Sequence, residues 1–248
     1  MNELIYILGN GKMAKAIAKG LNNSNFKVCF VLRDKNKVDN DTSNFILYND
    51  FDINDKICIL CFKPYNLDEV SLKFQNKKAK IIISPLAGIS LEKLQIIKSD
   101  FYMKIMPNIA AEFNKSCTTY ITKSNNNDFK NIALNIIKGF GNAIECESEN
   151  ELDLAMAING CAPAFLALVA ESIANGGLSI GLKNEKAHEL TKALFSSFES
   201  LIQNTHPAMI KENVCSPAGV SIKGVNVLEK HGIRSAFIEA IKSSANKS

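Results

Sequence analysis

The sequence predicts a doubly wound α/β domain followed by an all-helical domain, and three observations carry this prediction. The chain opens with an apolar strand and a glycine turn, strands and helices alternate as far as residue 146, and only helical patterns follow. Such alternation is what a mostly parallel sheet with helices on both faces requires. With 248 residues, the chain is long enough for two domains that each bury a core.

The first strand and the turn after it are typical of a dinucleotide-binding unit. Leu4–Leu8 is a continuous apolar run, and Gly9-Asn10-Gly11 leads into a helix that has Ala14 where the strict fingerprint has a third glycine. Gly9 lets the backbone turn, Gly11 lets it approach a pyrophosphate, and the helix N-terminus offers free N–H groups to an anion. An ordinary strand–turn–helix corner is the alternative interpretation of this motif.

The end of the second strand bears on cofactor choice. Phe26–Leu32 is the expected strand, and Arg33-Asp34 follows it. An acidic residue here binds the ribose 2′-hydroxyl of NAD, whereas an arginine accommodates the 2′-phosphate of NADP. Arg33 is one of only two arginines in the chain, so it favours NADP. Asp34 keeps NAD as an alternative, and a solvated surface arginine is the bland interpretation.

The other expected elements place further strand ends at one edge of the sheet. The segment Asp34–Asn44 is too short and polar for a full crossover helix. Ligands bind such sheets at the carboxyl ends of the strands. Asn108, which follows one of these ends, either offers its amide to a nicotinamide or ribose, or caps the next helix. The expected strands are Phe45–Tyr48, Ile57–Phe62, Lys80–Ser84, Tyr102–Met106 and Thr118–Thr122, with helices over 65–75, 90–98 and 127–138.

The stretch Leu152–Ala170 is apolar on every face except at Asp153 and Asn159, so it should be buried all round. A membrane span is disfavoured because polar residues and Pro163 interrupt the stretch and no cationic anchors bracket it. Pro163 should also kink the helix and free the carbonyl of Asn159. Too few helices follow to wrap it, so a second subunit is expected; they are Lys183–Gln203, Pro207–Asn213, Val220–Lys230 and Ile233–Ser244.

Composition argues against several other classes of protein. The net charge of +4 is mild and the lysines are scattered, which does not favour nucleic acid as a partner. The N-terminus reads as a strand rather than a signal peptide, and seven cysteines without framework spacing fit reduced cytoplasmic thiols. Cys58 and Cys61 should point to opposite faces of their strand. Three scattered histidines suggest no metal site.

Six short motifs follow one another along the chain. They are Leu8-Gly9-Asn10-Gly11-Lys12-Met13-Ala14-Lys15-Ala16-Ile17, Phe62-Lys63-Pro64, Ser84-Pro85-Leu86-Ala87-Gly88-Ile89, Met106-Pro107-Asn108, Asn159-Gly160-Cys161-Ala162-Pro163-Ala164-Phe165 and Ser216-Pro217-Ala218-Gly219-Val220-Ser221. In this order they closely resemble the motifs of the pyrroline-5-carboxylate reductase family, and the resemblance covers nearly the whole chain. The run from Val227 to Ala240 is also similar to the C-terminus of that family.

The resemblance implies an α/β Rossmann-like N-terminal domain over 1–148 and an all-helical dimerisation and substrate domain over 149–248. It implies NADPH-dependent reduction of 1-pyrroline-5-carboxylate to L-proline, the last step of proline synthesis, by a cytoplasmic homodimer or an assembly of dimers. Cofactor contacts then fall on Leu8, Gly9, Asn10, Gly11, Lys12, Met13, Arg33, Asn49, Cys61, Phe62, Lys63, Pro64, Leu86, Ala87 and Gly88, and substrate contacts on Glu149, Asn213, Val220 and Ser221. Asn49 is matched as a ribose contact just before a strand.

The loop Ser216–Ser221 is the expected cradle for the substrate carboxylate. Gly219-Val220-Ser221 opens a helix, where free N–H groups and a hydroxyl can hold an anion. Ser221 is therefore the candidate catalytic residue, and the alternative is that it only caps the helix. A protonated imine is already an electrophile, so no strong general base is needed, and no histidine falls in a motif.

The chain departs from the family pattern in the helix motif, at Asn159, Cys161, Ala162 and Phe165, and in the loop, where Ala218 replaces a glycine and Ser221 a threonine. These changes leave an NADP-binding scaffold without turnover as one alternative. The β-hydroxyacid dehydrogenases are another, but they need a lysine in the long helix, and none lies between Glu149 and Leu182.

Overall fold

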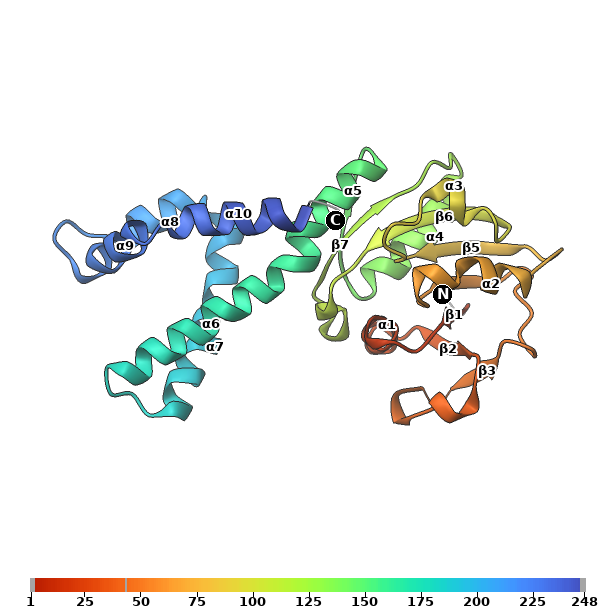
Figure 1. Ribbon diagram of the computed structural model, residues 1–248, viewed down its shortest axis with the longest axis horizontal. Helices are drawn as coiled ribbons and strands as arrows, with labels where there is room; N and C mark the ends of the chain where they lie inside the picture. Colours follow the sequence, from red (N-terminus) through yellow and green to blue (C-terminus); the bar gives the residue numbers. More distant parts are fainter. Residues whose placement is uncertain (1–2, 43, 246–248) are drawn as a thin grey trace. The chain divides into compact units, whose positions relative to one another are not determined.

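The computed structural model describes residues 3–42 and 44–245, which form two compact units divided between Gly160 and Cys161 (Figure 1). The sequence-based boundary between residues 148 and 149 lies at the start of helix α5 (Glu149–Met156). This helix contacts the sheet of the first unit, which is why the compact division falls later in the chain.

The first unit is built on an eight-stranded sheet of order β3-β2-β1-β4-β5-β6-β7-β8. The chain starts in the middle, runs outward through β2 and β3, and returns to place β4 on the other side of β1. The topological switch point therefore lies between β1 and β4. The strands are β1 (Leu4–Leu8), β2 (Lys27–Leu32), β3 (Phe45–Leu47), β4 (Ile57–Leu60), β5 (Ala79–Ser84), β6 (Ser99–Met106), β7 (Ser116–Ile121) and β8 (Gly141–Glu145).

The predicted α/β class is confirmed, with one difference in strand direction. Strands β1 to β6 pair in parallel, but β7 runs antiparallel to β6, and β8 then pairs in parallel with β7. The connection from β6 to β7 holds only the short turn η4 (Ile109–Phe113), and a parallel crossover needs about a dozen residues or more. The strand β8 was not among the expected elements.

Helices cover both faces of the sheet and create two apolar cores. Helices α1 (Lys12–Asn23) and α4 (Asn127–Lys138) pack on one face, and α2 (Leu67–Leu72), α3 (Leu91–Leu94) and α5 pack on the other. Strand β4 alternates between the two cores, and Cys58 and Cys61 accordingly pack on opposite faces, as predicted. All seven cysteines are free thiols.

The crossover after β2 is shortened, as the polar composition predicted. It consists of two 3-10 turns, η1 (Lys35–Lys37) and η2 (Asn40–Thr42), instead of a helix. A third turn, η3 (Pro64–Asn66), follows β4 and leads directly into α2. The helix expected over 90–98 is present only as the single turn of α3.

The second unit is all helical, and its helices agree closely with the expected ones. They are α6 (Ala162–Ser179), α7 (Asn184–Asn204), α8 (Pro207–Val214), α9 (Val220–Lys230) and α10 (Ile233–Ala245). Helices α6 and α7 pack together, yet Ala174 is the only buried residue of α6. Leu166, Leu168 and Ile173 are 50%, 65% and 41% exposed within the single chain. The helical run Glu149–Ser179 is also long and apolar enough to cross a membrane, by length and composition alone.

A π-turn, η5 (Ala157–Cys161), interrupts the apolar run just before Pro163. Proline lacks the N–H that would bond to the carbonyl of Asn159 in a regular helix. That carbonyl instead accepts a hydrogen bond of 2.9 Å from Nδ2 of Asn108. The freed carbonyl is confirmed by this contact, and the kink stays a prediction.

Candidate functional site

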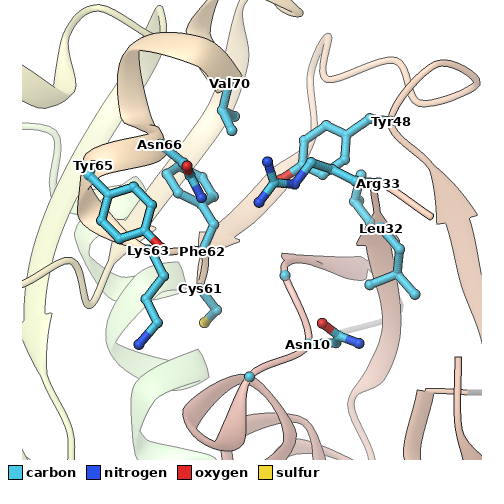
Figure 2. A pocket seen from close by; sticks show the side chains of 13 residues that line it. Asn10, Leu32, Arg33, Tyr48, Cys61, Phe62, Lys63, Tyr65, Asn66 and Val70 are labelled. Atoms are coloured by element: carbon cyan, nitrogen blue, oxygen red, sulfur yellow. The ribbon is translucent and has the colours of Figure 1, made fainter. Parts of the chain in front are cut away.

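A cavity of about 310 Å³ lies at the switch point of the sheet, where the ends of β1, β2 and β4 meet (Figure 2). It has the position that ligands take in doubly wound sheets. Seven of the predicted cofactor residues line it. The lining residues are Gly9, Asn10, Gly11, Val31, Leu32, Arg33, Tyr48, Cys61, Phe62, Lys63, Tyr65, Asn66 and Val70.

The glycine turn fits the role that the sequence predicted for it. Gly9 has a φ of 116°, and a Cβ there would lie 2.6 Å from the carbonyl oxygen of Cys61, so the turn needs glycine to pass β4 closely. A Cβ on Gly11 would meet no atom within 4 Å, which leaves open space beside the turn. Gly11 is the N-cap of α1 and provides no side-chain cap. The free N–H groups and the open space suit a pyrophosphate.

Arg33 and Asp34 have different environments although they are neighbours. The guanidinium of Arg33 extends into the cavity (Figure 2). Its Nη1 lies 3.3 Å from a carboxylate oxygen of Glu69 on α2. The carboxylate of Asp34 instead caps η1 by accepting a 2.9 Å hydrogen bond from the backbone N–H of Asn36. Of the two residues, therefore, only Arg33 faces the cavity.

Six lining residues were missed by sequence reasoning: Val31, Leu32, Tyr48, Tyr65, Asn66 and Val70. Tyr48 is buried, and burial raises the pKa of its phenol, so its hydroxyl stays protonated. Its position directly after β3 was the available signal, because strand ends in this sheet converge on the ligand site.

Asn49 occupies a different position from the one expected. It lies in the exposed turn after β3, whereas the next strand, β4, begins only at Ile57. Tyr48, its neighbour in sequence, lines the cavity, and Asn49 does not.

The remaining predicted cofactor residues lie around the cavity or along the same edge of the sheet. Leu8 is buried beneath the glycine turn, Lys12 and Met13 form the first turn of α1, and Pro64 begins η3. Leu86, Ala87 and Gly88 follow β5; Leu86 is buried and the other two are exposed.

Asn108 is occupied by structural contacts at both ends of its amide. Its Oδ1 accepts a hydrogen bond from the N–H of Ala110 and thereby caps η4, while Nδ2 donates to the carbonyl of Asn159. The capping interpretation is thus the one that the contacts support. Asn159 is itself buried and donates from Nδ2 to the carbonyls of Met106, at 2.6 Å, and Cys117, at 3.0 Å. Its Oδ1 is buried without a partner among the described residues.

Glu149 is likewise engaged within the first unit. One carboxylate oxygen accepts a 2.8 Å hydrogen bond from the N–H of Leu91, and the other lies 3.3 Å from Nζ of Lys123. The ammonium of Lys104, whose side chain is only 2% exposed, lies 3.8 Å from Glu149 and 3.2 Å from Asp153. The contacts of Glu149 thus fix the start of α5 against α3 and β6.

The predicted substrate loop connects α8 to α9 in the second unit. Gly219 is the N-cap of α9, so Ser221 is the second residue of the helix and the capping alternative for Ser221 is wrong. Ser221 is exposed, and its hydroxyl makes no hydrogen bond within the part of the chain that the structure describes. Val220 is 86% exposed, Ser216 and Asn213 are exposed, and Ala218 has a φ of 59°.

The structure describes no group of three or more histidine, cysteine or acidic side chains, within residues 3–42 and 44–245, that could hold a metal ion. A dinucleotide cavity at the switch point of a doubly wound sheet, followed by a helical unit with an exposed apolar face, defines a two-domain nucleotide-dependent oxidoreductase. Comparison with known proteins narrows this class to one family.

Residues 149–248 match the family model for pyrroline-5-carboxylate reductase dimerisation, and residues 4–88 match that for NADP oxidoreductase, coenzyme F420-dependent. The chain is 38% identical over 256 residues to a pyrroline-5-carboxylate reductase of Helicobacter pylori, covering 99% of this chain and 98% of the relative. This chain belongs to the pyrroline-5-carboxylate reductase family.

More distant relatives and solved structures agree. The pyrroline-5-carboxylate reductase of Synechocystis is 35% identical over 198 residues, covering 78% of this chain and 74% of the relative. The crystal structure of 1-pyrroline-5-carboxylate reductase from Streptococcus pyogenes is 26% identical, with a TM-score of 0.83 over 98% of this chain and 96% of that one. A Plasmodium falciparum pyrroline carboxylate reductase with NADP bound, 24% identical over 98% of this chain and 97% of that one, shares the fold with a TM-score of 0.83.

Proposed function

We propose that this protein reduces 1-pyrroline-5-carboxylate to L-proline with NADPH. The observation that carries the proposal is the 38% identity to a pyrroline-5-carboxylate reductase over 99% of the chain. The cavity at the switch point adds a binding site of the required kind. A β-hydroxyacid dehydrogenase would need a lysine in the long helix, and the sequence has none between Glu149 and Leu182.

The residues around the cavity fit NADPH, which supplies the hydride when it is bound. The glycine turn and the first N–H groups of α1 would hold the pyrophosphate, because they combine open space with uncapped donors. Arg33 would contact the 2′-phosphate, and Cys61, Phe62 and Lys63 would line the dinucleotide at the end of β4. Leu86–Gly88 would continue the binding edge at the end of β5.

In the second unit, the start of α9 would bind the substrate carboxylate. The N–H groups there have no side-chain cap, and the free hydroxyl of Ser221 can donate to the carboxylate or lie against the ring nitrogen. Asn213 and Glu149 are proposed contacts by resemblance to the family. Since the carboxylate of Glu149 already accepts from Leu91, its contribution would be to fix the start of α5.

We also propose that the protein works as a homodimer, or an assembly of dimers, in the cytoplasm, without membrane or nucleic-acid partners. The match to a dimerisation family over residues 149–248 supports the dimer. So do the exposed leucines of α6, which a second copy would cover. Burial in that interface accounts for the apolar run of α6 without a membrane.

The test is a steady-state assay with 1-pyrroline-5-carboxylate and either NADPH or NADH, on the wild type and on Arg33→Ala. A charge-assisted contact contributes about 1.5–3 kcal/mol, so the KM for NADPH should rise roughly tenfold to a hundredfold while that for NADH changes little. Equal effects on both cofactors would refute the role of Arg33. Cofactor binding without any turnover would favour the scaffold alternative.

A further inference from the structure

The cofactor cavity has an acidic residue beside its one arginine, and this residue has no role in the proposed function. Glu69 lies in the first turn of α2, and its two carboxylate oxygens are 3.3 Å and 3.4 Å from the same nitrogen, Nη1, of Arg33. The side chains of Arg33 and Glu69 are 49% and 57% exposed, so the pair is in contact with water. Arg33 lines the cavity, whereas Glu69 contacts Arg33 without lining the cavity itself.

The geometry of this pair is that of a replaceable contact. A strong arginine–carboxylate pair is bidentate and uses two guanidinium nitrogens. Here only Nη1 is used, and Nη2 and Nε of Arg33 make no hydrogen bond within the described residues. Exposed pairs of this kind contribute little to stability. A phosphate, with more charge and three acceptor oxygens, would compete well for the same guanidinium.

We infer that Glu69 is a specificity-determining residue that weakens binding of the cofactor 2′-phosphate. The inference rests on the proposed role of Arg33. Glu69 occupies the guanidinium when the phosphate is absent, and its negative charge repels the phosphate when it is present. Both effects act only on the phosphorylated cofactor, so Glu69 lowers the preference for NADP(H) over NAD(H) without abolishing it.

Among the described residues that line the cavity, no cation other than Arg33 lies where it could offset the charge of Glu69. Lys63 also lines the cavity, but its ammonium points away from the Arg33 guanidinium (Figure 2). Asp34, the other acidic residue nearby, does not line the cavity either, and its carboxylate is held as the cap of η1. Among the residues that line the cavity, Arg33 is thus the cation whose charge Glu69 directly offsets.

The chain offers a matched control for this charge. Asp68 precedes Glu69 on α2, is also exposed, and pairs with Lys93 at 2.6 Å instead of with Arg33. Like Glu69, it does not line the cavity. Asp68→Asn removes the same charge from the same helix turn, so it measures the general electrostatic effect without the contact to Arg33.

The experiment measures the Kd of the full-length protein for adenosine 2′,5′-bisphosphate and for 5′-AMP by calorimetry, because these probes differ only in the 2′-phosphate. Glu69→Gln should tighten binding of the bisphosphate about two- to tenfold and leave binding of 5′-AMP unchanged. Asp68→Asn should change both values by less than about twofold. Added salt should reduce the gain of Glu69→Gln.

Arg33→Ala separates failure of this inference from failure of the proposed cofactor site. If Arg33→Ala weakens the bisphosphate but Glu69→Gln leaves its Kd unchanged or raises it, Glu69 does not oppose the phosphate, and the role of Arg33 stands. If Glu69→Gln tightens binding of the bisphosphate only as much as Asp68→Asn does, the inference is also overturned. If Arg33→Ala affects both probes equally, the 2′-phosphate does not contact Arg33, and both proposals fail at this residue.

Discussion

Replacing Asn159 with alanine should destabilise the first unit more than the same replacement at an exposed asparagine. Its Nδ2 bridges the carbonyls of Met106 at the end of β6 and Cys117 in β7, and the side chain is 5% exposed. These strands are joined by a tight antiparallel connection, so the amide links the π-turn to both. Alanine would leave the buried carbonyl of Met106 and the half-buried carbonyl of Cys117 without this donor.

The expected loss in unfolding free energy follows from the hydrogen bonds that Asn159→Ala removes and from the unpaired atom that it also removes. A buried group left without its partner costs about 1–3 kcal/mol; the carbonyl of Met106 is such a group, and the half-buried carbonyl of Cys117 adds less. Removal of Oδ1 of Asn159, which is buried without a partner, returns part of that cost. The net loss should be about 2–3 kcal/mol. For a unit of this size, it corresponds to a fall in Tm of roughly 4–12 °C.

Urea denaturation followed by circular dichroism, with thermal melts, measures this loss. Asn135→Ala is the matched control, because Asn135 is exposed on α4 and its replacement should change the unfolding free energy by less than about 0.5 kcal/mol. Asn159→Ser, which restores the residue that the resembling family usually has, keeps a hydroxyl donor and should fall between the two. A wild-type midpoint for Asn159→Ala would show that these hydrogen bonds contribute no net stability.

Three further predictions concern the second unit. Ser221→Ala should lower kcat/KM for 1-pyrroline-5-carboxylate by the equivalent of about 1.5–3 kcal/mol. The Tm and the NADPH affinity should be nearly unchanged, because the hydroxyl of Ser221 has no partner within the described residues. A lower Tm with full activity would contradict this prediction. Ala218→Gly should raise the unfolding free energy by up to about 1 kcal/mol, since Ala218 is left-handed at a φ of 59°; a lower melting temperature would count against strain there. Leu166→Asp should yield insoluble or unfolded protein, as an unpaired charge in a dimer interface is costly, and an active, monodisperse monomer in light scattering would refute the interface.

The elements of this protein were largely predictable because burial leaves a local pattern. The apolar run of β4, the glycine turn and the free carbonyl of Asn159 before Pro163 each depend on residues that are close in the sequence. The position of Arg33 was predictable for the same reason, as the end of β2 is marked by the change from apolar to charged residues. Chemistry at strand ends could therefore be placed once the strands were recognised.

Features that depend on distant partners could not be predicted in this way. Periodicity reports which residues are buried but not the direction of a strand, so the reversal at β7 left no local mark. Arg33 and Glu69 are far apart in the sequence and meet only in the folded chain, so neither segment contains a local pattern that predicts their ion pair. Asn108 was ambiguous in sequence because an asparagine serves equally as a cap or as a ligand contact. Its contact with Asn159 decides in favour of the cap.

The position of the cavity has a consequence for how the protein is made. Every residue that lines it lies between Gly9 and Val70, in the first third of the chain. At synthesis rates of about 5–20 residues per second, the ribosome needs on the order of ten seconds or more to add the rest of the chain. All cofactor-facing side chains of the cavity thus emerge well before the helices that match the dimerisation family. A nascent chain therefore carries the complete lining of the cavity before it carries residues 149–248, which match that family.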